Sequence, residues 1–266
     1  MRYAGGNEDT GSSTKQDRSQ REGIMNTTAT KQTIVLVHGA YADSSSWNGS
    51  ITALRQAGHR VIAVANPLRE LEQDAQYLRD VLATIDGPVV IAGHSYGGHV
   101  MSHAAEGNPN VTALVYVASF LAEPGESLVD LVEKFPGARL GGAAQPFPYT
   151  TPEGTTATEL YIDPAQFHEL FAGDVDATTA EHMAATQRPL GLAAFEAPAS
   201  TAAWKSIPSW VLSATKDLAV PAELSRFMAE RAGATLVEVD ASHAVTVSQP
   251  ESVTDVILEA ARTTAR

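Results

Sequence analysis

The sequence predicts a single α/β domain, residues 31–266, built on a six-stranded, mostly parallel sheet with helices on both faces. Short runs of β-branched residues alternate with helix-like stretches at spacings that suit βαβ units. Two of these runs, 89–92 and 111–119, are apolar almost throughout, which is typical of strands covered on both faces. The alternation lapses once, over residues 121–205, so we expect an insertion after the fourth strand.

Turn signals in the sequence bound the expected elements. His38-Gly39 ends the first strand, Gly58 stops the first helix, and Asp86-Gly87-Pro88 breaks the second. The expected strands cover residues 33–37, 60–65, 89–92, 111–119, 209–214 and 235–239. The expected helices cover residues 46–57, 70–85, 96–106, a segment after Pro221, and 250–262. Between residues 121 and 205 shorter helix-like pieces lie among scattered Pro, Gly, Thr and Ala, and we expect them to form a cap.

The composition excludes several classes of partner and chemistry. A formal net charge of -13 argues against nucleic acid, whose binding depends on clustered Lys and Arg. The longest apolar stretch, Val111–Ala122, is shorter than the roughly 20 residues that cross a bilayer, so we expect no membrane insertion. The absence of cysteine excludes disulfides, thiolate metal sites and a cysteine nucleophile. No zinc-ligand spacing or phosphate-cradling loop is present, and we expect no metal and no cofactor.

The first thirty residues differ from the rest of the chain. They hold Gly, Ser, Thr, Asn and mixed charge without the apolar core of a secretory signal, which favours a cytoplasmic protein. We interpret residues 1–30 as a disordered or vestigial leader, with Met25 as a candidate natural start just ahead of the fold. The sequence is compatible with a homodimer but specifies no interface for one.

The strongest chemical signal is Gly93-His94-Ser95-Tyr96-Gly97-Gly98, a G-x-S-x-G element between an apolar strand and a helix. A nucleophile on so tight a turn needs neighbours without side chains, which Gly93 and Gly97 provide. The turn would present Ser95 Oγ at the carboxyl edge of the sheet, where open α/β sheets bind their ligands. The pattern predicts that Ser95 is a nucleophile.

Serine requires a base that is itself oriented by an acid. His243 follows the last strand, and Asp217 follows the fifth, so both should lie at the same sheet edge as Ser95. The order nucleophile, acid, base is the one that this arrangement uses. Glu123 and Glu126, just beyond the fourth strand, remain alternative acids.

An oxyanion formed at Ser95 needs two backbone N–H donors. The amide of Tyr96 directly follows the nucleophile, and the loop that opens at His38-Gly39 supplies the second donor, for which we choose Ala40. His38 and His94 flank this site at strand ends, and positional roles suit them better than that of the base.

These segments resemble the α/β-hydrolase superfamily over the whole span from Ile34 to Arg262, and in particular small six-stranded esterases related to methyl-ester hydrolases and hydroxynitrile lyases. The resemblance rests on four segments, namely Leu36-Val37-His38-Gly39-Ala40, the Gly93–Gly98 element, Lys216-Asp217-Leu218-Ala219-Val220-Pro221 and Ser242-His243-Ala244. It implies a catalytic triad of Ser95, Asp217 and His243, with Ala40 and Tyr96 as oxyanion donors.

The resemblance also separates reaction classes. Hydroxynitrile lyases of this branch carry threonine where this chain has Gly39, and lysine where it has Ala244. Dehalogenases on the same fold use an aspartate nucleophile, from which Ser95 departs. The expected function is therefore hydrolysis of small-molecule carboxylic esters through an acyl-enzyme. A lactonase, amidase or perhydrolase with the same triad, a lyase-type enzyme, and a non-catalytic ligand-binding protein remain alternatives.

The substrate is less well specified than the reaction. Trp47, near the oxyanion loop, and Trp204, at the end of the insertion, are candidate pocket walls. Aromatic residues of the cap could also line an apolar pocket, namely Phe135, Phe147, Tyr149, Phe167, Phe171 and Phe195. Most of these should instead pack the cap itself.

Overall fold

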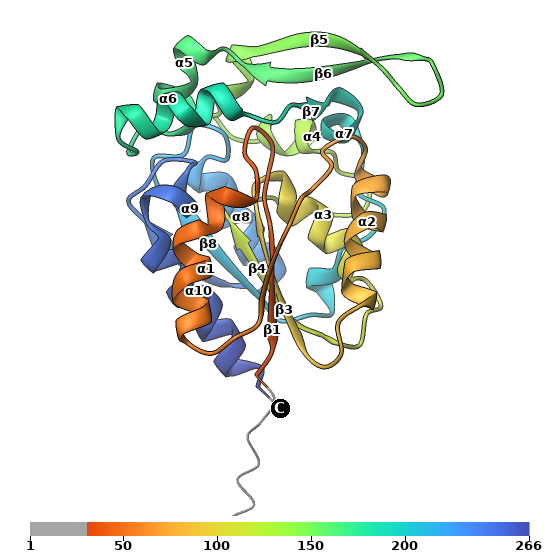
Figure 1. The fold of residues 1–266 in the computed structure, drawn as a ribbon, viewed down its shortest axis with the longest axis vertical. Helices are drawn as coiled ribbons and strands as arrows, with labels where there is room; N and C mark the ends of the chain where they lie inside the picture. Colours follow the sequence, from red (N-terminus) through yellow and green to blue (C-terminus); the bar gives the residue numbers. More distant parts are fainter. Residues whose placement is uncertain (1–30, 266) are drawn as a thin grey trace, which may run out of the picture.

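The structure is a computed structural model that describes residues 31–265, and the predicted leader, residues 1–30 with Met25, lies outside them. Its core is a six-stranded sheet with the order β2-β1-β3-β4-β8-β9, in which every neighbouring pair is parallel (Figure 1). The strands are β1 (Thr33–Val37), β2 (Val61–Val64), β3 (Val89–His94), β4 (Val111–Val117), β8 (Ser209–Ala214) and β9 (Thr235–Val239). The predicted fold class is confirmed, and the strand boundaries differ by a few residues at β2, β3 and β4.

Helices cover both faces of this sheet (Figure 1). One face packs against α1 (Asn48–Gln56) and α10 (Pro250–Thr263), and the other against α2 (Leu71–Ala83), α3 (Tyr96–Ala105) and α8 (Ala222–Ala232). Strand side chains alternate between the two apolar layers, as the two-residue period of a strand requires. In β1, Val35 and Val37 belong to the α2 and α3 side, whereas Ile34 and Leu36 belong to the α1 and α10 side.

The connection from β4 to β8 forms a cap over the carboxyl end of the sheet (Figure 1). Its strands form a separate antiparallel sheet with the order β5-β6-β7. The cap contains α4 (Leu128–Val132), η2 (Leu140–Ala143), β5 (Ala144–Thr150), β6 (Thr156–Ile162), α5 (Pro164–Phe171), α6 (Ala177–Thr186), β7 (Leu190–Gly191), α7 (Leu192–Glu196) and η3 (Ala203–Lys205).

The β5–β6 hairpin corrects the expectation of helix-like pieces alone in this insertion. Pro146 and Pro148 lie inside β5, and proline normally argues against a strand because it has no N–H to donate. Both are tolerated because β5 is an edge strand that pairs only with β6. Most of β5 is exposed, so it also lacks the apolar run that identified the core strands.

The short elements η1 (Ser44–Trp47) and α9 (Val245–Ser248) complete the description. The helix expected over 46–57 thus begins as a 3-10 turn, which Asp43 caps by accepting the amide N–H of Ser45 at 2.7 Å.

Candidate active site

Ser95 occupies the sharp turn between β3 and α3. Its backbone has φ 52° and ψ −126°, a conformation that a non-glycine residue rarely adopts. A Cβ at Gly97 would lie 2.4 Å from the carbonyl oxygen of Val37, and one at Gly93 would lie 2.6 Å from Gly98 Cα. The two glycines are therefore required because the turn packs directly against β1 and its own helix.

The main chain of Ser95 is held by the neighbouring strand β4. The Ser95 amide donates to the carbonyl of Val117 at 3.1 Å, and the Ser119 hydroxyl donates to the Ser95 carbonyl at 2.6 Å. The sequence analysis did not single out Ser119. The only sequence feature that marks Ser119 is its position at the end of the apolar run 111–119, and this feature does not distinguish it from other serines in turns.

His243 and Asp217 form a buried pair. Nδ1 of His243 lies 2.7 Å from Oδ2 of Asp217, and both side chains are inaccessible to solvent. The other oxygen, Oδ1, accepts the amide N–H groups of Ala219 at 2.7 Å and Val220 at 2.9 Å. These donors orient the carboxylate, whose Oδ2 accepts the Nδ1 proton and leaves Nε2 as the ring nitrogen with a free lone pair.

The alternative acids lie elsewhere. Glu123 pairs with Lys205, and Glu126 pairs with Arg231 at 3.0 Å. The carboxylate that reaches His243 is that of Asp217.

His243 is also tied to the residue before Ser95. His94 Nε2 donates to the backbone carbonyl of His243 at 2.9 Å, and the two rings have centroids 4.8 Å apart. Within residues 31–265 no direct hydrogen bond joins Ser95 Oγ to the His243 ring. Such contacts are often long before a substrate binds.

His38 and His94 have the positional character expected of them. His38 Nε2 accepts the amide N–H of Asn66 at 3.0 Å, and its Nδ1 donates to the carbonyl of Gly39 at 2.9 Å. Burial lowers the pKa of His38 to about 4 and that of His94 to about 3. Both imidazoles are therefore neutral near pH 7 and act as fixed hydrogen-bonding groups.

The loop after β1 passes directly over Ser95. A Cβ at Gly39 would lie 2.7 Å from both Ser95 Cβ and the His94 carbonyl oxygen, so no larger residue fits there. This contact brings Ala40 beside Ser95, and Ala40, Ser95 and Tyr96 line one cavity. Tyr96 is the first residue of α3, where amide N–H groups have no partner within the helix.

Asp74 is a buried acid that the sequence analysis did not select. It accepts the Tyr96 hydroxyl at 2.7 Å and the Arg69 amide at 3.1 Å, and burial raises its pKa. It thereby ties α2 to the residue after the nucleophile. The sequence feature that could have identified Asp74 is the presence of an acidic residue on the apolar stripe of the helix, between Leu71 and Leu78.

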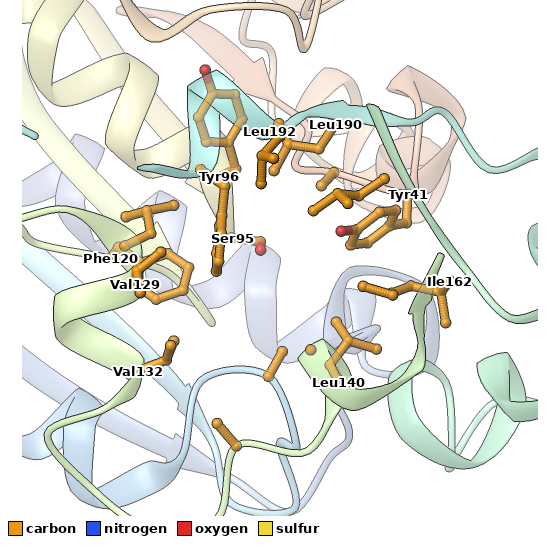
Figure 2. A pocket seen from close by; sticks show the side chains of 18 of the residues that line it. Tyr41, Ser95, Tyr96, Phe120, Val129, Val132, Leu140, Ile162, Leu190 and Leu192 are labelled. Carbon is orange, nitrogen blue, oxygen red and sulfur yellow. The ribbon is translucent and has the colours of Figure 1, made fainter. Parts of the chain in front are cut away.

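The cavity over Ser95 has a volume of about 400 Å³ and lies between the core and the cap (Figure 2). Its wall is mainly apolar and comes from both regions, including Phe120, Val129, Leu140, Ile162, Leu190 and Leu192. This size and lining suit a small, largely apolar organic molecule.

Neither tryptophan proposed as a pocket wall lines this cavity. Trp47 is fully buried in the apolar layer on the α1 and α10 side of the sheet. Trp204 donates Nε1–H to the carbonyl of Ala122 at 3.1 Å, and the guanidinium of Arg231 lies 5.7 Å from its ring. Their large apolar rings stabilise packing instead, and of the cap aromatics named above only Phe195 lines the cavity.

Within residues 31–265 no group of three His, Asp or Glu side chains is arranged to hold a metal ion. In the same part of the chain, every helix is too short or too polar to span a bilayer.

The fold and this arrangement define the class of protein. The alpha/beta hydrolase family matches residues 34–256, and the chain belongs to this family. The superfamily resemblance found in the sequence is thereby confirmed.

The relatives to which the chain is similar in sequence are named as esterases and hydrolases, which is the expected reaction class. The chain is 36% identical over 113 residues to a carbendazim hydrolyzing esterase from Nocardioides sp. (strain SG-4G), a match covering 38% of this chain and 47% of the relative. It is 26% identical to a pyrethroid hydrolase from Sphingobium wenxiniae, over 85% of this chain and 86% of that one. A putative chloroplastic methylesterase from Arabidopsis thaliana is 25% identical over 86% of this chain and 63% of its own length. The chain thus spans about half to two thirds of two of these relatives.

Solved structures show the same fold. The crystal structure of polyneuridine aldehyde esterase superposes with a TM-score of 0.75 at 24% identity, covering 86% of this chain and 98% of that one. A pyrethroid hydrolase from Sphingobium faniae JZ-2 gives a TM-score of 0.71 at 24% identity, covering 87% and 97%.

Proposed function

We propose that this chain is a serine esterase that cleaves small-molecule carboxylic esters through an acyl-enzyme. The observation that carries the proposal is the position of Ser95, on a tight turn that opens into an apolar cavity and lies beside a buried His243–Asp217 pair. The esterases and hydrolases among its relatives support the same reaction class.

The reaction begins when His243 Nε2 removes the proton of Ser95 and the serine oxygen attacks the ester carbonyl. The amides of Ala40 and Tyr96 donate to the oxyanion, and His243 then protonates the departing alcohol. Water, activated by His243, attacks the acyl-enzyme and releases the acid, which regenerates the Ser95 hydroxyl. No step requires a group beyond the chain and water.

Asp217 contributes electrostatically. Its carboxylate holds the His243 tautomer through Nδ1 and stabilises the imidazolium that forms when Ser95 is deprotonated. The amides of Ala219 and Val220 hold this carboxylate in a fixed orientation. A preorganised site of this kind does not need to reorganise during the reaction.

Two observations favour hydrolysis over a lyase reaction. A threonine at position 39 would collide with Ser95, because even a Cβ there lies 2.7 Å from Ser95 Cβ. Ala244 is buried, and its amide donates to the carbonyl of Phe171 at 2.9 Å, so this position supplies no cation for a departing anion. Lactones, amides and peracids would use the same triad, and a substrate panel separates them.

A cytoplasmic location also belongs to this proposal. It rests on the expectation drawn from the sequence composition above.

The test is hydrolysis of a panel of p-nitrophenyl esters and lactones by the wild type, Ser95→Ala and Asp217→Asn. We expect Ser95→Ala to abolish activity and Asp217→Asn to lower kcat by about 10³-fold to 10⁴-fold. The matched control is Asp240→Asn, because Asp240 lies on the same loop as His243 but is exposed and pairs with Lys216 rather than with His243. This variant should retain activity within about twofold.

A serine-directed phosphonate provides an independent measurement. Intact-mass analysis should show one adduct on the wild type and none on Ser95→Ala. A correctly folded protein that hydrolyses no member of the panel and is not labelled would contradict the esterase and favour a ligand-binding role.

A further inference from the structure

Three buried polar side chains line the cavity over Ser95, and Tyr41 is the one with no role yet assigned. Ser95 is the nucleophile, and the Tyr96 hydroxyl donates to Asp74 at 2.7 Å. Within residues 31–265 the Tyr41 hydroxyl has no hydrogen-bond partner. The other buried residues of the wall are apolar.

The Tyr41 ring is fixed between the catalytic loop and the cap. Its amide donates to the carbonyl of Arg188 at 2.9 Å, and its ring packs edge-on against Phe171, with centroids 6.3 Å apart. Phe171 in turn packs edge-on against His243 at 5.0 Å. The ring therefore has little freedom to turn away from the cavity.

The backbone of Tyr41 is strained. Its φ is +60°, a region that bulky residues rarely occupy and that costs free energy. Figure 2 shows the Tyr41 ring at the cavity wall, with its hydroxyl directed into the cavity on the side of Ser95. A glycine or asparagine would relieve the strain but would place no phenol there.

The chemistry of this hydroxyl is that of a neutral hydrogen-bonding group. Burial raises the pKa of Tyr41 above its ordinary value, so the phenol keeps its proton across the working range. The Tyr41 hydroxyl faces the cavity, so an apolar substrate that fills the cavity displaces water from it, which costs free energy unless a substrate oxygen accepts its hydrogen bond.

We propose that Tyr41 selects esters that carry a second, neutral oxygen near the scissile carbonyl, such as an ether, ketone or hydroxyl, on an otherwise apolar body. This inference rests on the proposed esterase function and deepens it by naming the substrate class. Glu133 and Glu196 also line the cavity and are exposed. Their negative charges disfavour anionic substrates, which agrees with a neutral acceptor rather than a carboxylate.

The test uses two pairs of isosteric esters in which one CH₂ is replaced by oxygen. On the acyl side the pair is p-nitrophenyl methoxyacetate and p-nitrophenyl butanoate, and on the alcohol side it is 2-methoxyethyl benzoate and n-butyl benzoate. The quantity measured is the ratio of kcat/KM for ether over alkyl ester within each pair, in the wild type and in Tyr41→Phe. This ratio cancels the intrinsic reactivity of each substrate when the two proteins are compared.

We expect Tyr41→Phe to lower this ratio about fivefold in at least one pair, because one hydrogen bond to the ether oxygen is lost while the ring is kept. Tyr96→Phe is the matched control, since its hydroxyl points to Asp74 rather than to the substrate. Any loss of activity that it causes should affect both members of a pair alike.

One result would overturn the proposal while leaving the esterase intact, namely a ratio that changes less than twofold in both pairs, with hydrolysis still dependent on Ser95. If both esters of a pair also lose activity equally in Tyr41→Phe, Tyr41 is a general support of the site. Absence of any Ser95-dependent hydrolysis would instead remove the esterase function, and this inference with it.

Discussion

The sheet core and the cap are built by different means, although they share the cavity. In β3 and β4 every residue is buried, and apolar contacts on both faces fix the strands. In β5 no residue is fully buried, and the hairpin depends on pairing with β6 and on a few polar contacts. The core therefore fixes Ser95, Asp217 and His243, and residues of the cap can vary the cavity at small cost to stability.

Specific contacts join the cap to the core. The amide of Gly191 donates to the carbonyl of Leu68 at 2.9 Å, and a Cβ at Gly191 would lie 2.2 Å from the Arg69 carbonyl oxygen. The Arg69 guanidinium pairs with Glu159 at 2.5 Å and lies 4.7 Å from the ring of Tyr149. One short loop before α2 thus contacts both β6 and β7.

The largest expected difference between the two regions is their response to acid. The core buries four histidines with lowered pKa values, namely His38, His94, His99 and His103. Burial lowers the pKa of His99 to about 3, and the Ser200 amide donates to His103 Nε2, which therefore carries no proton. The cap histidines, His168 and His182, are exposed.

In the unfolded chain histidine binds a proton below about pH 6.5. In the folded chain His38, His94 and His99 bind one only near pH 3 to 4. The unfolded state then holds more protons, so the free energy of unfolding falls as pH decreases from 6.5 to about 4, by up to about 1.4 kcal/mol per pH unit for each histidine. Urea unfolding at several pH values should show a total loss of more than about 5 kcal/mol.

One variant sharpens this measurement. His99→Gln should make the pH dependence shallower by about 1.4 kcal/mol per pH unit. A free energy of unfolding that is constant between pH 7 and pH 5 would contradict the assignment of the core histidines.

The second expected effect is a difference in stability between alanine substitutions at a core glycine and at a cap glycine. Gly97→Ala places a Cβ 2.4 Å from the Val37 carbonyl oxygen and should lower the free energy of unfolding by about 3 kcal/mol or more, with loss of esterase activity. Gly141→Ala, in the cap, meets no atom within 4 Å and should change stability by less than about 0.5 kcal/mol. Thermal and urea unfolding of both variants provide the measurement, and equal destabilisation would refute the contrast between core and cap.

The smallest expected effect concerns the ion pair between the two regions. Arg69→Met removes the contact to Glu159, and because Arg69 is partly exposed the global stability should change by less than about 1 kcal/mol. The β5–β6 amides should nevertheless exchange hydrogen several-fold faster, since the hairpin has lost an anchor. Arg139→Met is the matched control, because its partner Glu169 lies within the cap and both are exposed. Unchanged exchange in Arg69→Met would mean that this pair does not hold the hairpin.

Sequence patterning was informative where one physical requirement acts locally. The β-branched runs predicted the strands, and the glycines around Ser95 predicted the tight turn. The positions of Asp217 and His243 after strands placed them near Ser95, because sheet geometry brings strand ends to one edge. The cap hairpin was missed since its prolines and exposed positions lack a strand signal. Trp47 and Trp204 were assigned to the pocket because sequence proximity to a loop does not show which face of the sheet a ring enters.

The sequence by itself determined the α/β class, the order of the strands along the chain, and the residues that we propose for acyl transfer, because periodicity and tight turns depend on neighbours in sequence. Only the tertiary structure decided that His243 pairs with Asp217 rather than Glu123 or Glu126, that Asp74 supports Tyr96, and that the Tyr41 hydroxyl faces the substrate cavity. The Tyr96–Asp74 and His243–Asp217 contacts join residues that are 22 and 26 positions apart in the sequence. The position of Tyr41 depends on its contacts with the cap. Their energies depend on burial and direction, which no local pattern encodes.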